Sequence, residues 1–237
     1  MDKVSVVIST YNRFSYVLNT IKSVKEQTYP NLEIIMVNDG STQKEYYEYD
    51  FAGVKVVHLE KNSRTIFGFP CLGHVRNEGI KVAEGKYVAF CDDDDIWFPD
   101  KIQLQLAAME RTGCKMSSTD GLIGRGVYNP DKEYWVYNAE HYYHTLQNIY
   151  RSKGSKLLDG GFPTRWSLDF LKVHNCMIAS SVLIKKEILD KIGGFQNVKI
   201  SFEDYDCWLR ALEHTDSAYV SAVCFYYDAG HGDGQDY

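Results

Sequence analysis

The chain has 237 residues, enough for one large domain or two small ones, and its 44% hydrophobic content is ordinary for a packed globular protein. Its net charge of -6 argues against nucleic acid as the main partner, because proteins that bind phosphate backbones carry an excess of Lys and Arg. No segment approaches the roughly 20 apolar residues of a membrane-spanning helix, although peripheral contact with a membrane is compatible with the sequence.

The six cysteines are dispersed and form no C-x-x-C pair, so they are typical of reduced core thiols in a cytoplasmic protein. Residues 1–3 lead directly into a short predicted strand rather than into the apolar core of a signal peptide. We therefore expect a cytoplasmic protein.

Short β-branched runs alternate with helical patterns over the first half of the chain. Val4 to Ile8 and Leu32 to Val37 are typical of strands buried on both faces of a parallel sheet, and Val17 to Val24 has apolar residues at helical spacing. This order predicts a right-handed βαβ unit. The alternation continues with predicted strands Val54 to Leu59, Tyr87 to Cys91 and Lys115 to Thr119, and predicted helices His74 to Ala83 and Lys101 to Arg111. We predict an α/β fold with an open, mostly parallel sheet flanked by helices.

The alternation fails from Asp120 to Trp166, where only one helix is predicted, from Ala139 to Tyr150. This segment is rich in aromatic residues: Tyr128, Tyr134, Trp135, Tyr137, Tyr142, Tyr143, Tyr150 and Trp166. A segment of this length inside an α/β domain is more often a functional cover than a plain connector. The alternative is that half or more of these rings pack in the core or at a dimer interface.

Regular patterns resume after the aromatic segment. We predict a strand from Cys176 to Ile184, a helix from Lys186 to Ile192, a helix that begins near Phe202, and a last strand from Tyr219 to Tyr227. The glycine-rich end of the chain, from residue 229 onward, is expected to be mobile.

Polar clusters follow three of the predicted strands: Ser9 to Arg13, Asn38 to Thr42 and Asp92 to Asp95. In open α/β sheets ligands bind beyond the carboxyl ends of the strands, so the three clusters predict one shared site. Four consecutive carboxylates cannot all stay ionised there without a cation, and Mn2+ or Mg2+ suits an all-oxygen site completed by substrate phosphates. The chain has neither a P-loop nor a G-x-G-x-x-G motif, so the metal would hold the phosphates. A solvated acidic turn is the alternative.

Together these motifs resemble those of the family 2 glycosyltransferases of the GT-A fold. The matching pieces are Val6 to Arg13, Val37 to Thr42, Arg76 to Gly79, Phe90 to Trp97, Gly193 to Phe195 and Glu203 to Arg210. The resemblance implies one GT-A domain over residues 1–237, with a nucleotide-sugar-binding half at about 1–119 and an acceptor-binding, catalytic-base half at about 120–237.

By resemblance, Thr10, Tyr11 and Asp39 would hold the nucleotide base, with Tyr11 as a stacking platform and the Asp39 carboxylate accepting an N-H from uracil. Arg13, in the same motif, is assigned to nucleotide-sugar binding. Because Asp-Gly is a common turn pair, Asp39 can instead, or in addition, serve a backbone turn.

The family's D-x-D pattern maps onto the acidic run, although four aspartates leave its frame ambiguous. Asp94 is the best candidate for direct metal contact, and Asp92 or Asp93 would contact the ribose or supply a second metal contact. Arg76 would face the diphosphate or the acidic run, unless it is a plain surface arginine of a helix. His231 lies where many relatives carry a histidine able to meet the metal or the diphosphate.

Asp204 matches the second residue of the family's E-D pair, which supplies the catalytic base; the alternative is a carboxylate that only complements a helix N-terminus. The resemblance therefore implies a metal-dependent inverting transferase that moves one sugar from a nucleotide-sugar donor, a UDP-hexose, to a hydroxyl of a glycan or other acceptor. The aromatic segment is expected to build the acceptor side of the site.

Two alternative functions remain. A sugar nucleotidyltransferase shares a similar core but usually has a glycine-rich G-x-x-x-R loop after the first strand, where this chain has Thr10 to Arg13. A catalytically inactive carbohydrate-binding protein is disfavoured by the intact Asp94 and Asp204.

Overall fold

The structure is a computed structural model that describes residues 1–199 and 202–230. Its strands are β1 Val4–Thr10, β2 Leu32–Asn38, β3 Val54–His58, β4 Tyr87–Asp92, β5 Ile96–Trp97, β6 Met116–Gly124, β7 Trp135–Val136, β8 Arg165–Trp166, β9 Leu183–Lys185 and β10 Ser217–Asp228. Its helices are α1 Phe14–Lys25, α2 Glu45–Glu48, α3 Ser63–Phe67, α4 Leu72–Val82, α5 Lys101–Thr112, the π-helical turn η1 Tyr137–Tyr142, α6 Tyr143–Ser152, α7 Leu168–Leu171, the 3-10 turn η2 Ala179–Ser181, α8 Lys186–Ile192 and α9 Glu203–Leu212.

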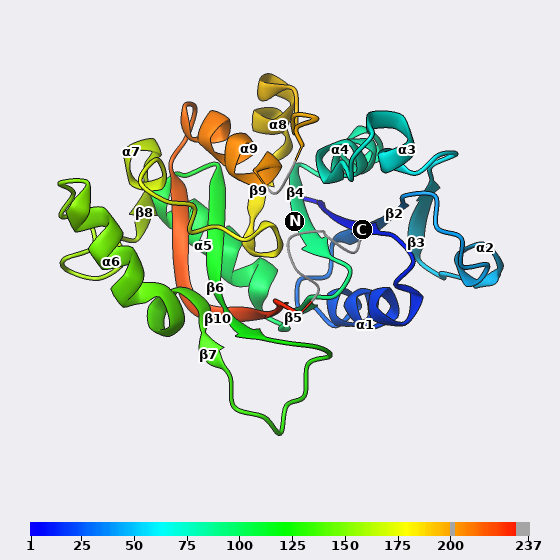
Figure 1. Cartoon of the computed structure of the whole chain (residues 1–237), viewed down its shortest axis with the longest axis horizontal. Coiled ribbons are helices and arrows are strands. Elements are labelled where there is room, and N and C mark those ends of the chain that lie inside the picture. The colour runs from blue at the N-terminus through cyan, green and yellow to red at the C-terminus, as the bar shows by residue number, and fades with distance from the viewer. Residues whose placement is uncertain (200–201, 231–237) are drawn as a thin grey trace.

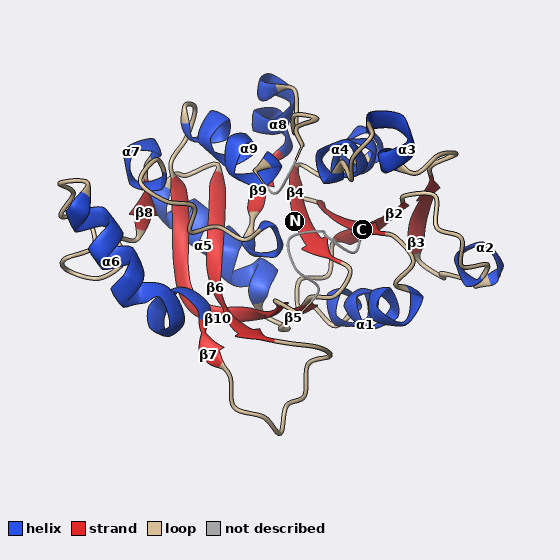
Figure 2. Cartoon of the chain, in the orientation of Figure 1, coloured by secondary structure: helices blue, strands red, loops and turns tan. Residues whose placement is uncertain are grey.

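One mixed sheet runs through the described part of the molecule, in the order β3-β2-β1-β4-β9-β6-β10-β5, with β7 paired to β6 and β8 to β10 (Figures 1 and 2). The four strands of the first half are parallel, as predicted. Beyond them, β9 runs antiparallel to both β4 and β6, and β10 returns parallel to β6. The predicted open α/β sheet is confirmed, with mixed strand directions in its second half.

The strands bury both faces, which explains their nearly continuous apolar runs. In β4, Val88 and Phe90 face one core, and Ala89 and Cys91 face the other, as the twofold repeat of a strand requires. The first core packs against α4, α6, α8 and α9, and the second against α1 and α5 (Figure 1). Apolar burial on two faces therefore fixes the strand register, and the register aligns the carboxyl ends of β1, β2 and β4.

The predicted strand from Cys176 to Ile184 is wrong over most of its length. Residues 179–181 form η2, and only Leu183–Lys185 pairs as β9. The side chain and the amide of Ser181 both bond to the Ile178 carbonyl, which closes a turn in place of a strand ladder. The predicted helix from Ala139 to Tyr150 exists, but it begins as η1 and continues as α6.

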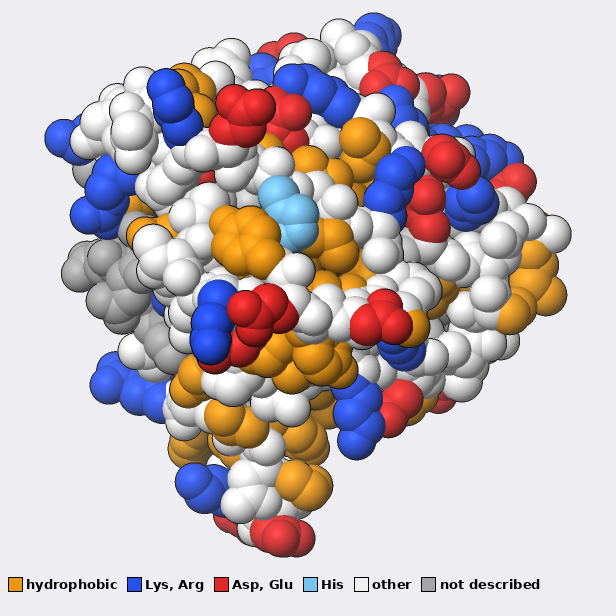
Figure 3. All heavy atoms as spheres, turned by 90° about the vertical axis from the view of Figure 1, so that its right-hand side faces the viewer, with side chains coloured by type: hydrophobic (Ala, Val, Ile, Leu, Met, Phe, Trp, Pro, Cys, Tyr) orange, Lys and Arg blue, Asp and Glu red, His pale blue; other side chains and the backbone are white. Residues whose placement is uncertain are grey.

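All six cysteines are free and buried. Within residues 1–199 and 202–230, no helix has both the length and the apolar composition needed to span a membrane. On the face that carries β3, α2 and α3, basic and acidic side chains are interspersed around small apolar areas (Figure 3).

Candidate active site

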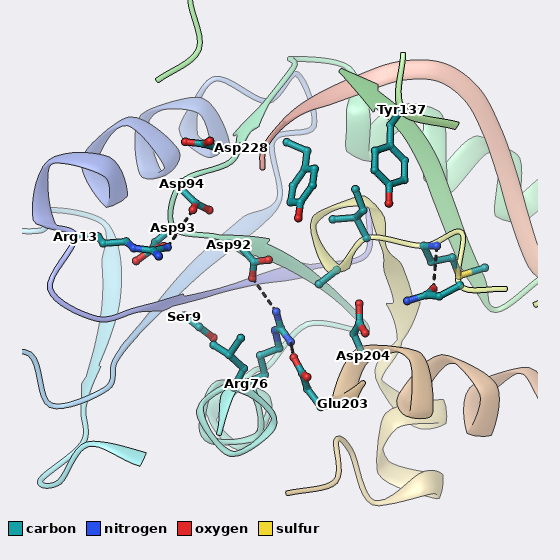
Figure 4. A pocket seen from close by; sticks show the side chains of 16 residues that line it. Ser9, Arg13, Arg76, Asp92, Asp93, Asp94, Tyr137, Glu203, Asp204 and Asp228 are labelled. Carbon is teal, nitrogen blue, oxygen red and sulfur yellow. Dashed lines mark hydrogen bonds and ion pairs between the residues drawn. The ribbon is translucent and has the colours of Figure 1, made fainter. Parts of the chain in front are cut away.

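A cavity of about 210 Å³ lies where β1 and β4 end, against η1, η2 and the start of α9 (Figure 4). Its lining includes six carboxylic acids and two arginines: Asp92, Asp93, Asp94, Glu203, Asp204, Asp228, Arg13 and Arg76. The sequence motifs of both halves of the chain therefore meet in one place. The volume lies below the roughly 300 Å³ at which pockets for drug-sized ligands begin, so it can take only part of a nucleotide sugar.

The acidic run forms a tight turn directly after β4. The Asp95 amide bonds to the Asp92 carbonyl, and the Thr20 hydroxyl lies 2.8 Å from the carbonyl oxygens of both Asp93 and Asp95. The Asp92 amide donates to the Ser180 hydroxyl of η2 at 3.0 Å. Hydroxyl groups of α1 and η2 thus bond to the backbone of the acidic run and hold the turn in place.

Two arginines offset part of the negative charge. Arg13 Nη1 lies 3.2 Å from Asp93 Oδ1 and 3.0 Å from Asp94 Oδ2. Arg76 projects from α4 and bonds to Asp92 Oδ1 and to Glu203 Oε1, both at 2.8 Å. Arg76 is buried, not a plain surface arginine, and through these two pairs it joins β4 to α9, whereas its contact with a diphosphate stays a prediction.

The two arginines do not balance the negative charge of the acidic run. Burial first, then the carboxylates of Asp95, Asp93 and Asp92, raise the pKa of Asp94 to about 10. Burial also raises the pKa of Asp93 to about 6. The acidic run therefore holds protons unless a further cation is supplied.

The donor set fits a hard divalent ion that is completed by substrate. The described residues contain no ready-made group of three or more metal-binding side chains. Mg2+ is usually held by only one or two carboxylates plus phosphate oxygens and water, and Asp92 and Asp94 can supply these carboxylates. Their oxygen chemistry suits Mg2+ or Mn2+.

Asp204 lies across the cavity from the acidic run, in the first turn of α9, with its carboxylate directed into the cavity (Figure 4). Its neighbour Glu203 is fixed by Arg76, and this pair orients the start of the helix. Burial and then the Glu203 carboxylate raise the pKa of Asp204 to about 7. A group with this pKa can accept a proton near neutral pH.

Two other family motifs interlock beneath Arg76. The Asn77 side chain accepts from the Phe195 amide at 2.9 Å and donates to the Phe195 carbonyl at 2.8 Å. Gly194 has φ +70°, and a Cβ there would lie 2.4 Å from Asn77 Oδ1. The Phe195 ring faces the Arg76 guanidinium at 5.4 Å, so this contact helps to hold the arginine in place.

The residues assigned to the base lie outside the cavity lining. Asp39 is fully buried, and its carboxylate accepts from the amide and hydroxyl of Ser63, both at 2.7 Å, and from the Asn62 side chain at 3.1 Å. These bonds tie Asp39 to the start of α3, and the predicted backbone turn is present as well, because Gly40 has φ +64° and its amide donates to the Asn38 carbonyl at 2.9 Å. Thr10 is buried and bonds to Tyr46, whereas Tyr11 is half-buried. Base binding by Thr10, Tyr11 and Asp39 stays a prediction, and His231 lies outside the described residues.

Asp228 lines the cavity but was missed by the sequence analysis, which named Tyr137 only as one of the aromatic rings. The Asp228 amide donates to Asp95 Oδ1 at 2.9 Å, which ties the end of β10 to the acidic run. Asp228 directly follows the predicted strand Tyr219 to Tyr227, so the strand-end rule applied to the first, second and fourth strands could have found it.

Most of the aromatic segment packs in the core or on the surface rather than at the cavity. Trp166 is fully buried and stacks on Tyr219 at 4.3 Å, and Tyr150 is also fully buried. Trp135 is 65% exposed on β7. Tyr142 and Tyr143 are half-buried against the same core, so core packing accounts for four of the eight rings, and of the eight only Tyr137 lines the described cavity.

Comparison with known proteins identifies the family. The model of the family "Glycosyl transferase family 2" matches residues 5–192. An uncharacterized glycosyltransferase of Rickettsia typhi is 30% identical over 222 residues, which cover 94% of this chain and 60% of the relative. The UDP-Glc:alpha-D-GlcNAc-diphosphoundecaprenol beta-1,3-glucosyltransferase WfaP of Escherichia coli is 28% identical over 220 residues, 90% of this chain and 71% of that protein.

The fold is also shared with a solved structure. S. aureus TarS 1-349 in complex with UDP-GlcNAc superposes with a TM-score of 0.68 at 21% identity, over 95% of this chain and 58% of TarS. The chain spans between 16% and 60% of the length of the first three curated relatives. The family match covers most of the chain, and the chain therefore belongs to glycosyltransferase family 2.

Proposed function

We propose that the chain is a metal-dependent, inverting glycosyltransferase that moves one sugar from a nucleotide-sugar donor, a UDP-hexose, to a hydroxyl of a glycan or other acceptor. The observation that carries the proposal is the placement of Asp204 across one cavity from the acidic run. In the proposal, residues of about 1–119 bind the donor and residues of about 120–237 supply the acceptor side and the base.

Charge supports the metal requirement. A diphosphate would enter a cavity lined by six carboxylic acids and only two arginines. The negative charges of the diphosphate and of the carboxylates would repel one another. A divalent ion held by Asp92 and Asp94 would neutralise charge on the departing diphosphate. Arg13 and Arg76 pair with these carboxylates and hold them in place.

Asp204 supports the inverting step. A sugar hydroxyl is too weakly acidic to attack at neutral pH, so Asp204 takes its proton as the new oxygen–carbon bond forms and the bond to the diphosphate breaks. One displacement inverts the anomeric carbon. Retention by double displacement would need a second carboxylate, placed as nucleophile on the opposite face of the sugar. The other acids of the cavity have different roles: Asp92 and Glu203 pair with Arg76, Asp93 and Asp94 pair with Arg13, and Asp228 ends β10 beside Asp95.

The names of the relatives support a UDP-sugar donor, since WfaP is named for UDP-Glc and TarS is titled with UDP-GlcNAc. The family match leaves the nucleotidyltransferase alternative without support. The placement of Asp204 in the cavity, where burial raises its pKa to about 7, favours an enzyme over an inactive carbohydrate-binding protein.

The proposal is tested by replacing Asp204 with Asn, which keeps the shape of the side chain but removes the base. We expect kcat to fall by roughly 10²- to 10⁴-fold while donor affinity changes little. Asp206→Asn is the matched control, because Asp206 lies on the same helix but pairs with Arg210 at 2.7 Å outside the cavity. NMR of the first product from an α-linked UDP-hexose should show a β linkage. An α product, or equal turnover in the two variants, would contradict the proposal.

A further inference from the structure

Tyr137 has a special position among the residues of the cavity. It is the first residue of η1 and directly follows β7, which pairs with β6. Figure 4 shows its ring on the wall opposite Glu203, with the hydroxyl directed into the cavity toward Asp204. π-helical turns are rare and occur often at functional sites.

The Tyr137 hydroxyl is available to a ligand. Within residues 1–199 and 202–230 it makes no hydrogen bond, although the ring is half-buried and packs edge-on against Tyr142 at 4.9 Å. Burial, Tyr142 and then acidic neighbours including Asp204 raise the pKa of Tyr137, so the phenol stays neutral and can donate. A half-buried donor without a protein partner is expected to bond to water or to a ligand.

The backbone next to Tyr137 is held rigidly by Asp120 of β6. The Asp120 carboxylate is fully buried and accepts from the amides of Asn138 at 2.9 Å and Ala139 at 3.0 Å, which are two of the free amides at the start of η1. It also accepts from the Tyr219 hydroxyl at 2.9 Å. A side chain on so constrained a turn is preorganised for binding.

We infer that Tyr137 determines acceptor specificity: its hydroxyl bonds to a second oxygen of an acceptor sugar whose attacking hydroxyl is held by Asp204, and Asp120 positions Tyr137 for this contact. The inference rests on the proposed function. The acceptor class follows from the lining, because Met177, Ile178 and Ala179 form an apolar wall beside the polar groups. A sugar ring has an apolar face, which can pack against this apolar wall, and a rim of hydroxyls, which can bond to the polar groups.

The test uses Tyr137→Phe, which removes one oxygen atom and keeps the ring. The donors are UDP-glucose and UDP-GlcNAc with Mn2+, and the acceptor probes are the methyl glycosides of glucose, galactose and N-acetylglucosamine. We expect the acceptor KM to rise by roughly 3- to 10-fold, the effect of one neutral hydrogen bond, while the donor KM and the slow transfer to water stay unchanged. Tyr143→Phe is the control, because its hydroxyl donates to the Leu158 carbonyl outside the cavity lining and should affect only stability.

The positioning role of Asp120 has a separate measurement. Asp120→Asn should also raise the acceptor KM and leave the donor KM unchanged, and in the Tyr137→Phe background it should raise the acceptor KM no further. A purely structural role would instead lower kcat and donor affinity together, with additive effects in the double variant. Such a result would overturn the positioning role.

A binding measurement separates this inference from the proposed function. Saturation-transfer NMR of the same methyl glycosides is recorded with UDP and Mn2+, so that no turnover is needed. Weaker sugar binding by Tyr137→Phe than by the wild type supports the inference. If the wild type shows this binding but transfers no sugar in the kinetic assay, only the proposed function fails. Equal binding to both proteins, binding of none of the three glycosides to the wild type, or a rise in donor KM alone would overturn the inference.

Discussion

Asp204 is subject to opposing influences at the scale of the single residue. Burial and the Glu203 carboxylate raise its pKa, whereas Arg76 and the Tyr205 amide lower it. Burial and Glu203 have the larger effect, so the pKa is about 7. Its position in the first turn of α9 also favours the ionised form, so the helix reduces the rise without cancelling it.

This pKa predicts the pH dependence of turnover. The base must be ionised to accept a proton, so kcat/KM should rise as the pH increases from about 6 to about 8 and then level off. The measurement is the initial rate of UDP release at constant ionic strength and saturating Mn2+. The residual activity of Asp204→Asn should lose this dependence, and a flat wild-type profile would contradict the role of Asp204.

The sequence predicted the identity of several cavity residues but not their partners. Arg76, Asp92 and Asp204 were assigned from motifs, and all three line the cavity. The bond between Arg76 and Glu203 spans 127 positions along the chain, and no local pattern encodes a pairing of that separation. Tyr137 was named only as one of many rings, because its special position depends on the turn made by η1.

At the scale of the element, α4 holds the two sides of the site together through Arg76. The arginine has only 4% of its side chain exposed and satisfies one carboxylate of β4 and one of α9. Its removal leaves two charges in the cavity wall without their shared partner.

Arg76→Ala should therefore lower the free energy of unfolding by roughly 3–5 kcal/mol, the usual cost of breaking a buried ion pair. Urea unfolding at neutral pH measures this loss. Arg151→Ala is the matched control, since Arg151 is 53% exposed in its pair with Asp159 and such surface pairs contribute about 0–1 kcal/mol. Similar losses in the two variants would show that Arg76 is not structurally important.

Helices and strands were predictable where buried apolar residues recur at the spacing of a helix or a strand. The central strands β1, β2 and β4 and the helices α1, α4 and α5 follow from their apolar periodicity. The run from Cys176 to Ile184 has the same apolar composition, yet η2 turns there so that Ser180 can accept from the Asp92 amide. The local bonds of Ser181 to the Ile178 carbonyl and this distant contact together replace the strand, and sequence patterns cannot reveal the distant contact.

At the scale of the whole molecule, the fold concentrates acidic groups at one edge of the sheet and ties them to it by backbone bonds. This arrangement favours a protonated site in the ligand-free protein, because burial raises the pKa of Asp93 to about 6 and of Asp204 to about 7. Buried Asp39, whose pKa is raised to about 6, acts in the same direction. Ligand-free stability is thus linked to the pH and to divalent ions.

The sign of this linkage follows from proton counting. In the unfolded chain these aspartates lose their protons near pH 3.9, whereas the folded protein keeps them to about pH 6 or 7, so between these values the folded state binds more protons and stability falls as the pH rises. A divalent ion that binds the ionised carboxylates should restore stability, and it should do so more at pH 8 than at pH 5, where protons compete with it. Thermal unfolding with Mn2+ or Mg2+, against KCl of equal ionic strength, measures both effects, and Asp94→Asn should lose most of the metal-induced rise in Tm. A metal effect of equal size at both pH values that also survives in Asp94→Asn would place the ion elsewhere on the protein.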